Sequence, residues 1–523
     1  MNMRDNANVT SLSPSMDSPL QLIRDLLPFS QPHADSKATA DFRTQLLTTS
    51  GLSPLELVRK LGSAVLPSIS RQADPQLRFS QLEEMRQEAE RALPSLEQEI
   101  GQAVLPLPRA ATSAAINADN LLKGMAQAYA GIAHDILEHH HGSGLNQQLH
   151  RAIQRALALL SRRQLLAYRA YTAPSAASWQ MLHALYRMAC DPLAKPLNGE
   201  TAPIEHEYLG ALLFAYLEPA KLPRPQLDLI HACTWQLAAY AVVTEASPEI
   251  LNSRRAESCF LVCPDTGCPG QSLSRLSSDL PESGCLIIDC TQVLAALDRN
   301  LARQPGKAVQ PDLEISPLLL HSLRVAVGGR NARRFSRSKF KPRADLVGGL
   351  DEVIAFLDGN AFSRRALDAD CRHDGKTFKT SEWSLIDESP DGFLIRFVNG
   401  EKCRIGAGAV VALQPRESSR IHVCLVRRVS ASNTRLELGL QLLSPQVSIV
   451  ELPSEKAASL RAIFLHSLPA YGKFSGLIAP PGRLVARQRV TFNTAGRTLH
   501  RQIGKCIEAN EGLEFVALDP LPD

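Results

Sequence analysis

The stretch SLIDESPDGFLIRF, Ser384 to Phe397, places a short polar segment between two runs in which apolar and polar residues alternate. Alternation with a period of two is typical of strands that have one buried face. The polar segment alone is typical of a turn, because Asp, Ser, Pro and Gly are residues that turns favour. We therefore expect antiparallel strands on either side of it. The apolar positions of the second strand are Phe393, Ile395 and Phe397.

The chain after this stretch continues as short strand-like runs. Asn399-Gly400 is a dipeptide favoured in two-residue hairpin turns, because both turn positions need positive φ, and we expect a hairpin there. The runs IHVCLVRRV and RLELGLQLL follow with the same period of two. Several short antiparallel strands separated by turns predict a small barrel. One face of the last run carries Leu436, Leu438, Leu440 and Leu442.

The chain before about residue 250 has the period of helices. Apolar residues recur at steps of three and four, and Pro-rich or Gly-rich breaks such as HHHGSG and EPAKLPRPQ separate the runs. One run extends from Leu209 to Leu217 and another from Leu227 to Val242. Paired helices joined by Pro or Gly turns predict an all-α interaction domain, and because the pattern has no fixed repeat period we do not predict a solenoid. Its clearest stripes are Leu121, Met125, Tyr129, Ile132 and Ile136, and Leu145, Leu149, Ile153, Leu157 and Leu160.

Composition limits the classes of protein to consider. A chain of 523 residues predicts roughly three or four domains. Its 44% hydrophobic and 21% charged residues are ordinary for a globular protein, and a net charge of +4 indicates no particular partner. The polar start and the absence of an apolar run of about 18 residues predict a cytoplasmic protein without membrane insertion. In that compartment the eleven cysteines are expected to be reduced.

A basic run precedes the predicted barrel. RVAVGGRNARRFSRSKFKPR, Arg324 to Arg343, contains eight Lys or Arg and no acidic residue. Alone it is typical of a solvated linker that can hold an anion. Within it, RRFSR contains Arg333, Arg334 and Arg337, and Arg337 lies four positions after Arg333.

The Arg-x-x-x-Arg spacing followed by Asp-x-Ser-x-x-Gly resembles the PilZ family, receptors for the bacterial messenger cyclic di-GMP. GEKCRIGAGAVVALQP and IHVCLVRRVSASNTRLELGLQLLSP resemble the later strands of the barrel in this family. The resemblance covers roughly Asn331 to Pro445. It implies a six-stranded antiparallel β-barrel that binds cyclic di-GMP. The implied ligand-binding residues are Arg333, Arg334, Arg337, Asp387, Ser389 and Gly392.

The chemistry of these residue types suits that ligand. An Arg guanidinium donates two parallel hydrogen bonds to guanine or phosphate oxygens and stacks on bases. Asp387 supplies acceptor oxygens for the guanine Watson-Crick edge, and the Ser389 hydroxyl is small enough to contact a phosphate. Gly392 permits positive φ or close approach of the backbone to the ligand. Arg334 is the candidate for an additional contact to a stacked nucleotide dimer.

Two features depart from the family pattern. About fifty residues separate Arg337 from Asp387, and this insert contains a helix-like LDEVIAFLDGNAFSRRALDAD. Arg364 and Arg365 lie within it and are alternative candidates for the arginines that close over the ligand, which we call the arginine strap. Pro390 fixes one φ between the Ser and the Gly, which either preorganises the loop or holds it away from the ligand.

Other candidate sites are weaker. The cysteines between 259 and 290 lack a C-x-x-C pair, so no zinc spacing is present. His134, Glu138 and His141 share one helix face, which fits a solvated helix end better than a metal site. The sequence contains no hydrolase, Walker or dinucleotide motif, so we expect no enzyme, no metal and no cofactor. Trp179, Tyr186 and Met188 are expected in the core.

The predicted fold class is α+β multidomain, with an all-α N-terminal half, a PilZ-like six-stranded antiparallel barrel and a C-terminal β-rich segment. CFLVC, CLIIDC and TQVLAALDRNLAR predict a small mixed region before the barrel. RAIFLHSL, VTFNTAG and GLEFVAL are the strand candidates after it. The expected divisions are a flexible segment at 1–30, helices at 31–250, the mixed region at 251–325, the barrel at 326–446 and the last segment at 447–523.

The expected function is that of a non-enzymatic cyclic di-GMP effector. Its helical domain would contact an unidentified partner protein, and the family implies control of motility, biofilm or exopolysaccharide output. One alternative is a nucleic-acid-binding protein that uses Arg324 to Arg343 on phosphates, although the aromatic content of 5% offers few stacking residues. The other alternative is a PilZ-like barrel that binds no ligand and acts as a scaffold.

Overall fold

The structure is a computed structural model, and it describes the chain in several ranges. These are residues 19–27, 36–139, 145–191, 202–247, 258–276, 284–302, 317–328, 342–358, 380–400, 405–418, 420–432, 435–453, 460–467 and 474–521. Most of the segment expected to be flexible, 1–30, lies outside these ranges.

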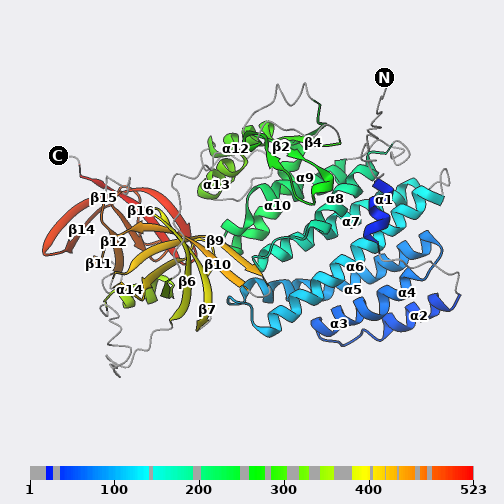
Figure 1. Ribbon diagram of the computed structural model, residues 1–523, viewed down its shortest axis with the longest axis horizontal. Helices are drawn as coiled ribbons and strands as arrows, with labels where there is room; N and C mark the ends of the chain where they lie inside the picture. Colours follow the sequence, from blue (N-terminus) through cyan, green and yellow to red (C-terminus); the bar gives the residue numbers. More distant parts are fainter. Residues whose placement is uncertain are drawn as a thin grey trace, which may run out of the picture.

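The N-terminal half is helical, as predicted (Figure 1). Both predicted apolar stripes lie on long helices, α6 (Arg109–His139) and α7 (Asn146–Arg169), and nearly all of their residues are buried in one core. Trp179, Tyr186 and Met188 are buried in the same core, which confirms that prediction. The other helices are α1 (Pro19–Leu26), α2 (Ser36–Leu47), α3 (Pro54–Lys60), α4 (Leu66–Ser70), α5 (Pro75–Gln102), α8 (Ala176–Ala189), α9 (Ala202–Tyr216) and α10 (Leu227–Leu237).

Side-chain caps define where two of these helices begin. Asp74 precedes α5 and accepts a hydrogen bond from the Gln76 amide at 3.0 Å. Ser175 precedes α8 and accepts one from the Ser178 amide at 3.3 Å. Each cap satisfies a backbone amide that has no partner within its helix. The Ser175 cap also determines where the chain turns between α7 and α8.

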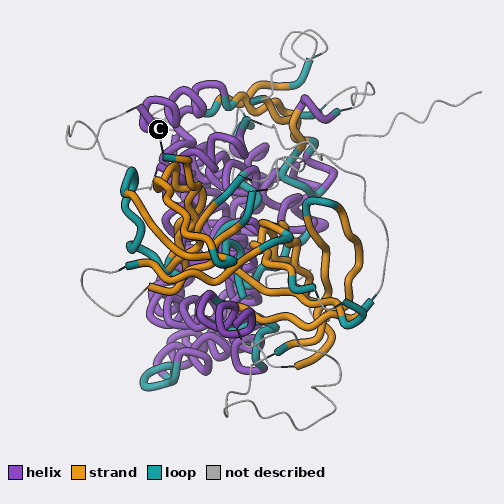
Figure 2. Tube along the Cα trace, turned by 90° about the vertical axis from the view of Figure 1, so that its left-hand side faces the viewer, coloured by secondary structure: helices purple, strands orange, loops and turns teal. Residues whose placement is uncertain are grey.

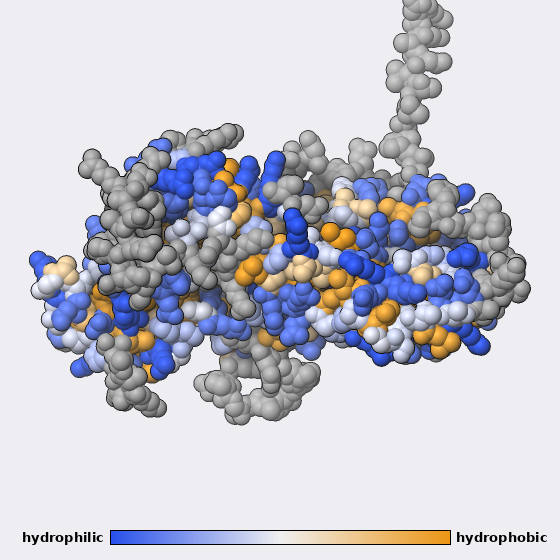
Figure 3. Space-filling model, turned by 90° about the horizontal axis from the view of Figure 1, so that it is seen from below, coloured by the Kyte–Doolittle hydropathy of each residue, from blue (hydrophilic) through white to orange (hydrophobic). Residues whose placement is uncertain are grey.

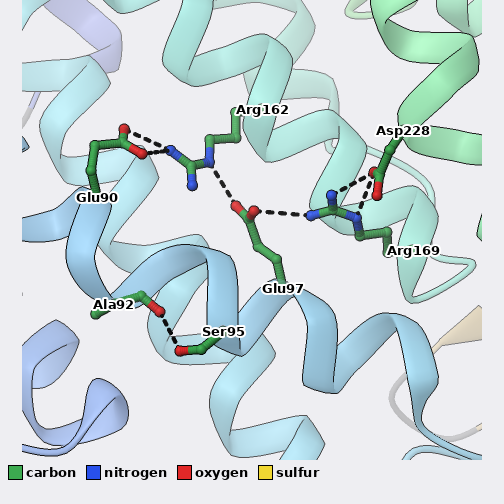
Figure 4. Close-up of polar contacts among 7 residues, drawn as sticks. All are labelled: Glu90, Ala92, Ser95, Glu97, Arg162, Arg169 and Asp228. Carbon is green, nitrogen blue, oxygen red and sulfur yellow. Dashed lines mark hydrogen bonds and ion pairs between the residues drawn. The ribbon is translucent and has the colours of Figure 1, made fainter.

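Glu97 joins two arginines of α7 to helix α5 (Figure 4). Its carboxylate lies 2.6 Å from Arg162 Nε and 3.1 Å from Arg169 Nη1, and its side chain is only 9% exposed. Arg162 also pairs with Glu90 of α5, and Arg169 pairs with Asp228 of α10. Because both cations bridge helices, the network positions the C-terminal end of α7 against α5 and α10.

The small mixed region contains a four-stranded sheet in the order β1-β4-β2-β3, with helices α12 (Thr291–Ala302) and α13 (Pro317–Val327). CFLVC and CLIIDC supply β2 (Cys259–Val262) and β4 (Leu286–Asp289), as predicted. The helical run expected to reach Val242 ends earlier, because β1 (Val242–Glu245) pairs with β4. The remaining strand is β3 (Gln271–Ser272).

Cys263 and Cys285 form a disulfide next to this sheet. The expectation that all cysteines are reduced is therefore wrong for this pair. The two residues follow β2 and precede β4, which are adjacent antiparallel strands, so the pairing of the strands brings them together. Their separation of 22 positions gives no C-x-x-C signal from which the pairing could be read.

The barrel is closed and antiparallel, with strand order β10-β7-β6-β5-β8-β9. Phe393, Ile395 and Leu438 are among its core residues, which confirms the inward faces predicted from the period of two. The hairpin predicted at Asn399-Gly400 is wrong, because β7 pairs with β6 and β10 and not with β8. The strands are β5 (Arg343–Gly348), β6 (Ser381–Ser389), β7 (Gly392–Gly400), β8 (Val410–Pro415), β9 (His422–Ser432) and β10 (Arg435–Ser444).

A second six-stranded antiparallel sheet follows in the order β11-β12-β13-β16-β15-β14. Its outer strands β11 and β14 contact each other, so the sheet is nearly closed. The three predicted strand candidates correspond to β12, β14 and β16. Viewed from the barrel side, both sets of strands lie in front of the helices (Figure 2). The strands are β11 (Val447–Leu452), β12 (Leu460–Leu465), β13 (Gly476–Ala479), β14 (Arg489–Thr494), β15 (Arg497–Asn510) and β16 (Leu513–Pro520).

Helix α14 (Leu350–Asp358) lies between the barrel and the second sheet. Its buried residues Val353 and Ile354 pack in one cluster with Val410 of the barrel and Ile463 of the second sheet. Among the described residues, no helix is long and apolar enough to cross a membrane. On the face shown in Figure 3, hydrophobic residues lie interspersed among hydrophilic ones.

Candidate functional site

The Asp-x-Ser-x-x-Gly motif forms the hairpin between β6 and β7. Ser389 pairs with Gly392, which leaves Pro390-Asp391 as a two-residue loop. The Ser389 hydroxyl donates to the Gly392 carbonyl at 3.2 Å, and the Leu442 amide of β10 donates to the Asp391 carbonyl at 2.8 Å. The interruption that the sequence showed is therefore a tight turn held against β10.

Gly392 has a structural reason to be glycine. Its φ is 156°, and a Cβ placed there would lie 1.8 Å from the Leu440 carbonyl oxygen of β10. A backbone atom at that distance cannot be displaced by a side-chain rotation. The glycine therefore permits close approach of β10, whereas the sequence led us to expect close approach of a ligand.

Asp387 follows an irregularity in the pairing of β6 with β7. Leu385 pairs with Ile395 and Asp387 pairs with Leu394, so one extra residue lies on β6 between them. Since Leu385 and Ile395 are core residues and successive side chains alternate, this β-bulge places Asp387 and Leu394 on the outer face. Asp387 is half-buried there. Without the bulge, the same alternation would direct its carboxylate into the core.

Arg333, Arg334 and Arg337 lie outside the described residues, but the position at which the chain enters the barrel is described. The Pro342 carbonyl accepts a hydrogen bond from the Leu385 amide at 3.0 Å, and Arg343 pairs with Ser384. Because β5 and β6 are antiparallel, Pro342, which directly precedes β5, lies beside the end of β6 that carries Asp387. Asp387 thus lies two positions after Leu385, the residue of β6 that contacts Pro342 near the end of the basic run Arg324 to Arg343.

The long insert follows β5 in the sequence. Its first described part is α14, which packs with β8 and the second sheet. Strands β6 and β7, which carry the motif, contribute no residue to that cluster. Arg364 and Arg365 lie outside the described residues. The fifty-residue separation therefore does not keep Pro342 away from the β6–β7 hairpin.

A salt-bridge cluster joins β5 to β6 below the motif. Arg416 lies 3.0 Å from Asp345 on β5 and 3.3 Å from Glu382 on β6. The hydrogen bonds and charge of Asp345, together with Glu382, raise the pKa of the Arg416 guanidinium, so it remains charged. This cluster stabilises the pairing of β5 with β6, the two strands that begin the barrel after Pro342.

Arg428 is a neighbour that the sequence motifs did not reveal. On the outer face, Asp387 pairs with Leu394, Leu394 pairs with Gly439, and Gly439 pairs with Arg428. Arg428 is exposed, and its guanidinium has no ion-pair partner among the described residues. The period of two in IHVCLVRRV predicted its strand, but only the register shows that Arg428 lies in this row.

Two other arginines nearby already have partners. Arg396 on β7 lies 2.7 Å from Glu437 on β10, one row below Leu394 and Gly439. Arg427 pairs with Glu508 of the second sheet at 2.6 Å. Arg428 therefore differs from both in having a guanidinium available for an anion.

The histidine-rich end of α6 does not form a metal centre in the described residues. His134 Nδ1 lies 3.5 Å from Asp135 and 3.6 Å from Glu138, and His141 lies outside the described residues. Within the described part of the chain, no group of three or more metal-binding side chains is present.

Comparison with known proteins gives one match. Residues 42–249 match the family model described as cyclic-di-GMP receptor FimW, N-terminal domain. This match covers less than half of the chain and lies in the helical half, outside the barrel. The helical half is therefore similar to the N-terminal domain of a cyclic-di-GMP receptor. Neither the curated proteins nor the solved structures provide a match.

Proposed function

We propose that this protein is a non-enzymatic cyclic di-GMP effector whose barrel binds the dinucleotide. In this proposal Arg333, Arg334 and Arg337 form a strap over the β6–β7 hairpin, where Asp387 and Ser389 provide the remaining polar contacts. The helical half contacts a partner protein, and the output is motility, biofilm formation or exopolysaccharide production. The family match supports the ligand class, because it concerns a receptor for the same messenger.

The observation that carries the proposal is the hydrogen bond between the Leu385 amide and the Pro342 carbonyl. Arg337 precedes Pro342 by five residues, and five residues of extended chain span about 17 Å at most. An Arg side chain adds further reach. Both halves of the bipartite motif are therefore available to one ligand on the outer face of β6 and β7, despite the long insert.

Two roles from the sequence interpretation are revised in this proposal. Gly392 supports the ligand indirectly, because it allows β10 to pack against the hairpin. The Ser389 hydroxyl donates to the Gly392 carbonyl, and it would have to rotate to donate to a phosphate. Asp387 keeps its proposed role as the acceptor for guanine, since the bulge places it on the outer face.

Ligand capture would change the contacts that Arg333, Arg334 and Arg337 make. Arginines that close over a bound anion form charge-assisted hydrogen bonds, which are about twice as strong as neutral ones. New contacts of this kind at a ligand site can alter the contacts of neighbouring elements. The barrel is joined to the helical half through Tyr171, so such a change has a route to the proposed partner surface.

Calorimetric titration of the full chain with cyclic di-GMP, GTP and single-stranded DNA tests this function. We expect binding of cyclic di-GMP, weakened about ten-fold or more by Arg337→Ala and by Asp387→Ala, because each removes a charged hydrogen-bond partner. Arg435→Ala is the matched control, since Arg435 is an exposed barrel arginine at the opposite end of β10 from Gln441, which pairs with Gly392.

The alternatives predict different titrations. DNA binding with steep salt dependence and no cyclic di-GMP signal would favour the nucleic-acid alternative. No detectable heat with any ligand at micromolar protein would favour the scaffold. Cyclic di-GMP binding that both substitutions leave unchanged would place the site elsewhere in the chain.

A further inference from the structure

Strands β14 and β15 and the loop before them form a strongly basic surface, which we call the basic hairpin. From Pro480 to Ile507 the sequence contains six Lys or Arg and no Asp or Glu, whereas the whole chain has a net charge of only +4. All six are exposed except Arg501, which is half-buried, and none has an ion-pair partner among the described residues. In Figure 1 the hairpin lies at the end of the molecule opposite α2. The six are Arg483, Arg487, Arg489, Arg497, Arg501 and Lys505.

The outer part of the basic hairpin is a two-stranded ribbon. β14 pairs with β15 along its whole length, whereas β16 pairs with β15 no farther towards the turn than Arg501. The turn at Ala495 and Gly496 has positive φ at both positions, as tight hairpins require. The four residues of β15 before Arg501 therefore have only β14 as a paired neighbour.

Strand alternation distributes the cations between both faces of this ribbon. Val490 is buried in the core of the second sheet, so Arg489 lies on the opposite, outer face. Arg501 pairs with Val490 and Arg497 pairs with Thr494, which places both arginines on the inner face, nearer the turn. Cations therefore flank the ribbon on both faces.

The outer face carries only polar or basic side chains. Two cross-strand contacts hold them, because the Thr491 hydroxyl lies 3.0 Å from His500 Nδ1 and the Thr498 hydroxyl donates to Asn493 at 2.7 Å. Thr, Asn and Gln side chains, together with Arg, are groups that proteins use to contact nucleic-acid phosphates and sugars. The residues of this face are Arg489, Thr491, Asn493, Thr498, His500 and Gln502.

The loop before β14 is held in place by Glu514 of β16. The Glu514 carboxylate accepts hydrogen bonds from the amides of Gly482 and Arg483, each at 3.0 Å. The Arg487 amide donates to the Ile503 carbonyl at 2.8 Å. The backbone at both arginines is therefore fixed without a partner molecule, which lowers the entropic cost of binding one.

Two acidic side chains lie on neighbouring strands. Asp519 of β16 pairs with Gln502 and so lies in the outer-face row that contains Arg489. Glu451 is exposed on β11, which contacts β14. Neither forms an ion pair with a cation of the basic hairpin, and two carboxylates do not balance six cations. The surface therefore remains positively charged.

We infer that the basic hairpin binds double-stranded DNA through the phosphates that line a groove. A two-stranded ribbon fits the major groove of B-form DNA, and cations on both faces can reach both phosphate walls. A flat anionic membrane would contact only one face, and in this fully described segment Val485, 64% exposed, is the one large exposed apolar side chain. A protein partner usually buries aromatic or other apolar anchors, which the outer face lacks.

Fluorescence anisotropy of a labelled duplex, titrated with the full chain, tests the inference. We expect binding at about 50 mM salt to a duplex of about 20 base pairs, and a steep loss as salt rises, because each phosphate contact releases counterions. The double variant Arg489→Ala with Arg497→Ala should weaken binding at least about ten-fold. It should also reduce the slope of log affinity against log salt by about two.

Arg420→Ala with Arg435→Ala is the matched control. Both arginines are exposed on the barrel, so the control has the same net charge as the hairpin variant. It should keep the affinity for duplex DNA. If the hairpin variant does not fold, Arg483→Ala with Lys505→Ala takes its place with the same expected loss of binding.

The inference is overturned if duplex DNA does not bind at low salt, if the hairpin variant and the control bind equally, or if a single strand binds more tightly than the duplex. Loss of binding in Arg333→Ala with Arg337→Ala, but not in the hairpin variant, would assign DNA to the basic run Arg324 to Arg343 instead.

Tighter hairpin-dependent binding to polyglutamate or to phosphatidylglycerol vesicles would identify a protein or a membrane as the partner and would overturn the inference as well. The basic hairpin shares no residue with the proposed dinucleotide site. Cyclic di-GMP binding that depends on Asp387 but not on Arg489 would leave the barrel proposal intact in each of these cases. The two proposals can therefore fail separately.

Discussion

The hydroxyl of Tyr171 accepts a hydrogen bond from the Ala407 amide of the barrel at 3.1 Å. The same hydroxyl donates to the Leu222 carbonyl of the helical half at 3.1 Å, and the Tyr171 carbonyl accepts from the Ala431 amide of β9 at 2.9 Å. Tyr171 lies two residues after Arg169, the last residue of α7, yet its ring belongs to the barrel core, as does Leu105. Tyr171 therefore ties the helices to the barrel through three hydrogen bonds and its buried ring.

Tyr171→Phe should lower the free energy of unfolding by about 1 to 3 kcal/mol. The substitution keeps the buried ring but leaves the Ala407 amide and the Leu222 carbonyl without their partner. Urea denaturation measures the loss. Tyr168→Phe serves as the control, because the structure shows no hydrogen bond from the Tyr168 hydroxyl among the described residues. An equal loss in both variants would contradict the role of the Tyr171 hydroxyl.

Glu97→Gln should destabilise the helical half by about 1 to 3 kcal/mol. The change removes the shared acceptor of two largely buried arginines, and each retains only one other partner. Glu88→Gln is the control, since its partner Arg91 is 67% exposed and such pairs contribute little. Thermal unfolding of both variants should show a lower midpoint only for Glu97→Gln.

Gly392→Ala should disrupt the barrel whether or not ligand is present. The added Cβ would meet the Leu440 carbonyl oxygen at 1.8 Å, and relief of that contact requires movement of β10. Gly496→Ala separates this clash from backbone strain, because Gly496 has φ +74° and no atom within 4 Å. Near-ultraviolet circular dichroism should show a much larger change at Gly392. Similar spectra for the two variants would refute the packing role.

Arg428→Ala should weaken cyclic di-GMP binding about ten-fold, because a charged hydrogen-bond donor is lost from the row that contains Asp387. The control is again Arg435→Ala, which replaces an exposed arginine of the barrel at the opposite end of β10. Calorimetric titration of each variant with cyclic di-GMP measures the two affinities. An unchanged affinity in Arg428→Ala would restrict the site to β6, β7 and the arginine strap.

His183 should make the protein less stable in mild acid. Burial lowers its pKa to about 4, and its ring lies between the Tyr208 hydroxyl at 3.0 Å and the Cys268 carbonyl at 2.9 Å. The unfolded chain, with an ordinary pKa near 6.5, binds a proton that the folded chain excludes. Stability is therefore fully present above about pH 6.5 and falls as the pH drops towards 4, by roughly 3 kcal/mol.

His183→Gln should reduce this pH dependence, measured as urea midpoints between pH 7.5 and 5. His231, whose pKa burial also lowers to about 4, should retain its own contribution in the variant. Replacement of the exposed His500 by Gln provides the comparison. If the urea midpoint falls with pH equally in His183→Gln and in the His500 variant, the pH dependence of stability arises at another group.

Local patterns in the sequence determined which segments are helices and strands. Steps of three and four residues predicted α6 and α7, and alternation predicted the inward faces of β7 and β10, because burial of one face imposes the period of the element. The bipartite arginine and Asp-x-Ser-x-x-Gly motif also followed from the sequence alone. These features depend on neighbouring residues, so they can be read without knowledge of the fold.

Pairing between distant segments was decided only by the tertiary structure. Asn399-Gly400 has the composition of a hairpin, but the barrel order places β8 beside β5. The bulge that turns Asp387 outward and the hydrogen bond of Pro342 with Leu385 likewise depend on long-range register and packing. Their energies come from contacts between residues far apart in the chain, which no local pattern encodes. The sequence alone determined the residues of the candidate motif, and the register of the barrel strands decided their surroundings.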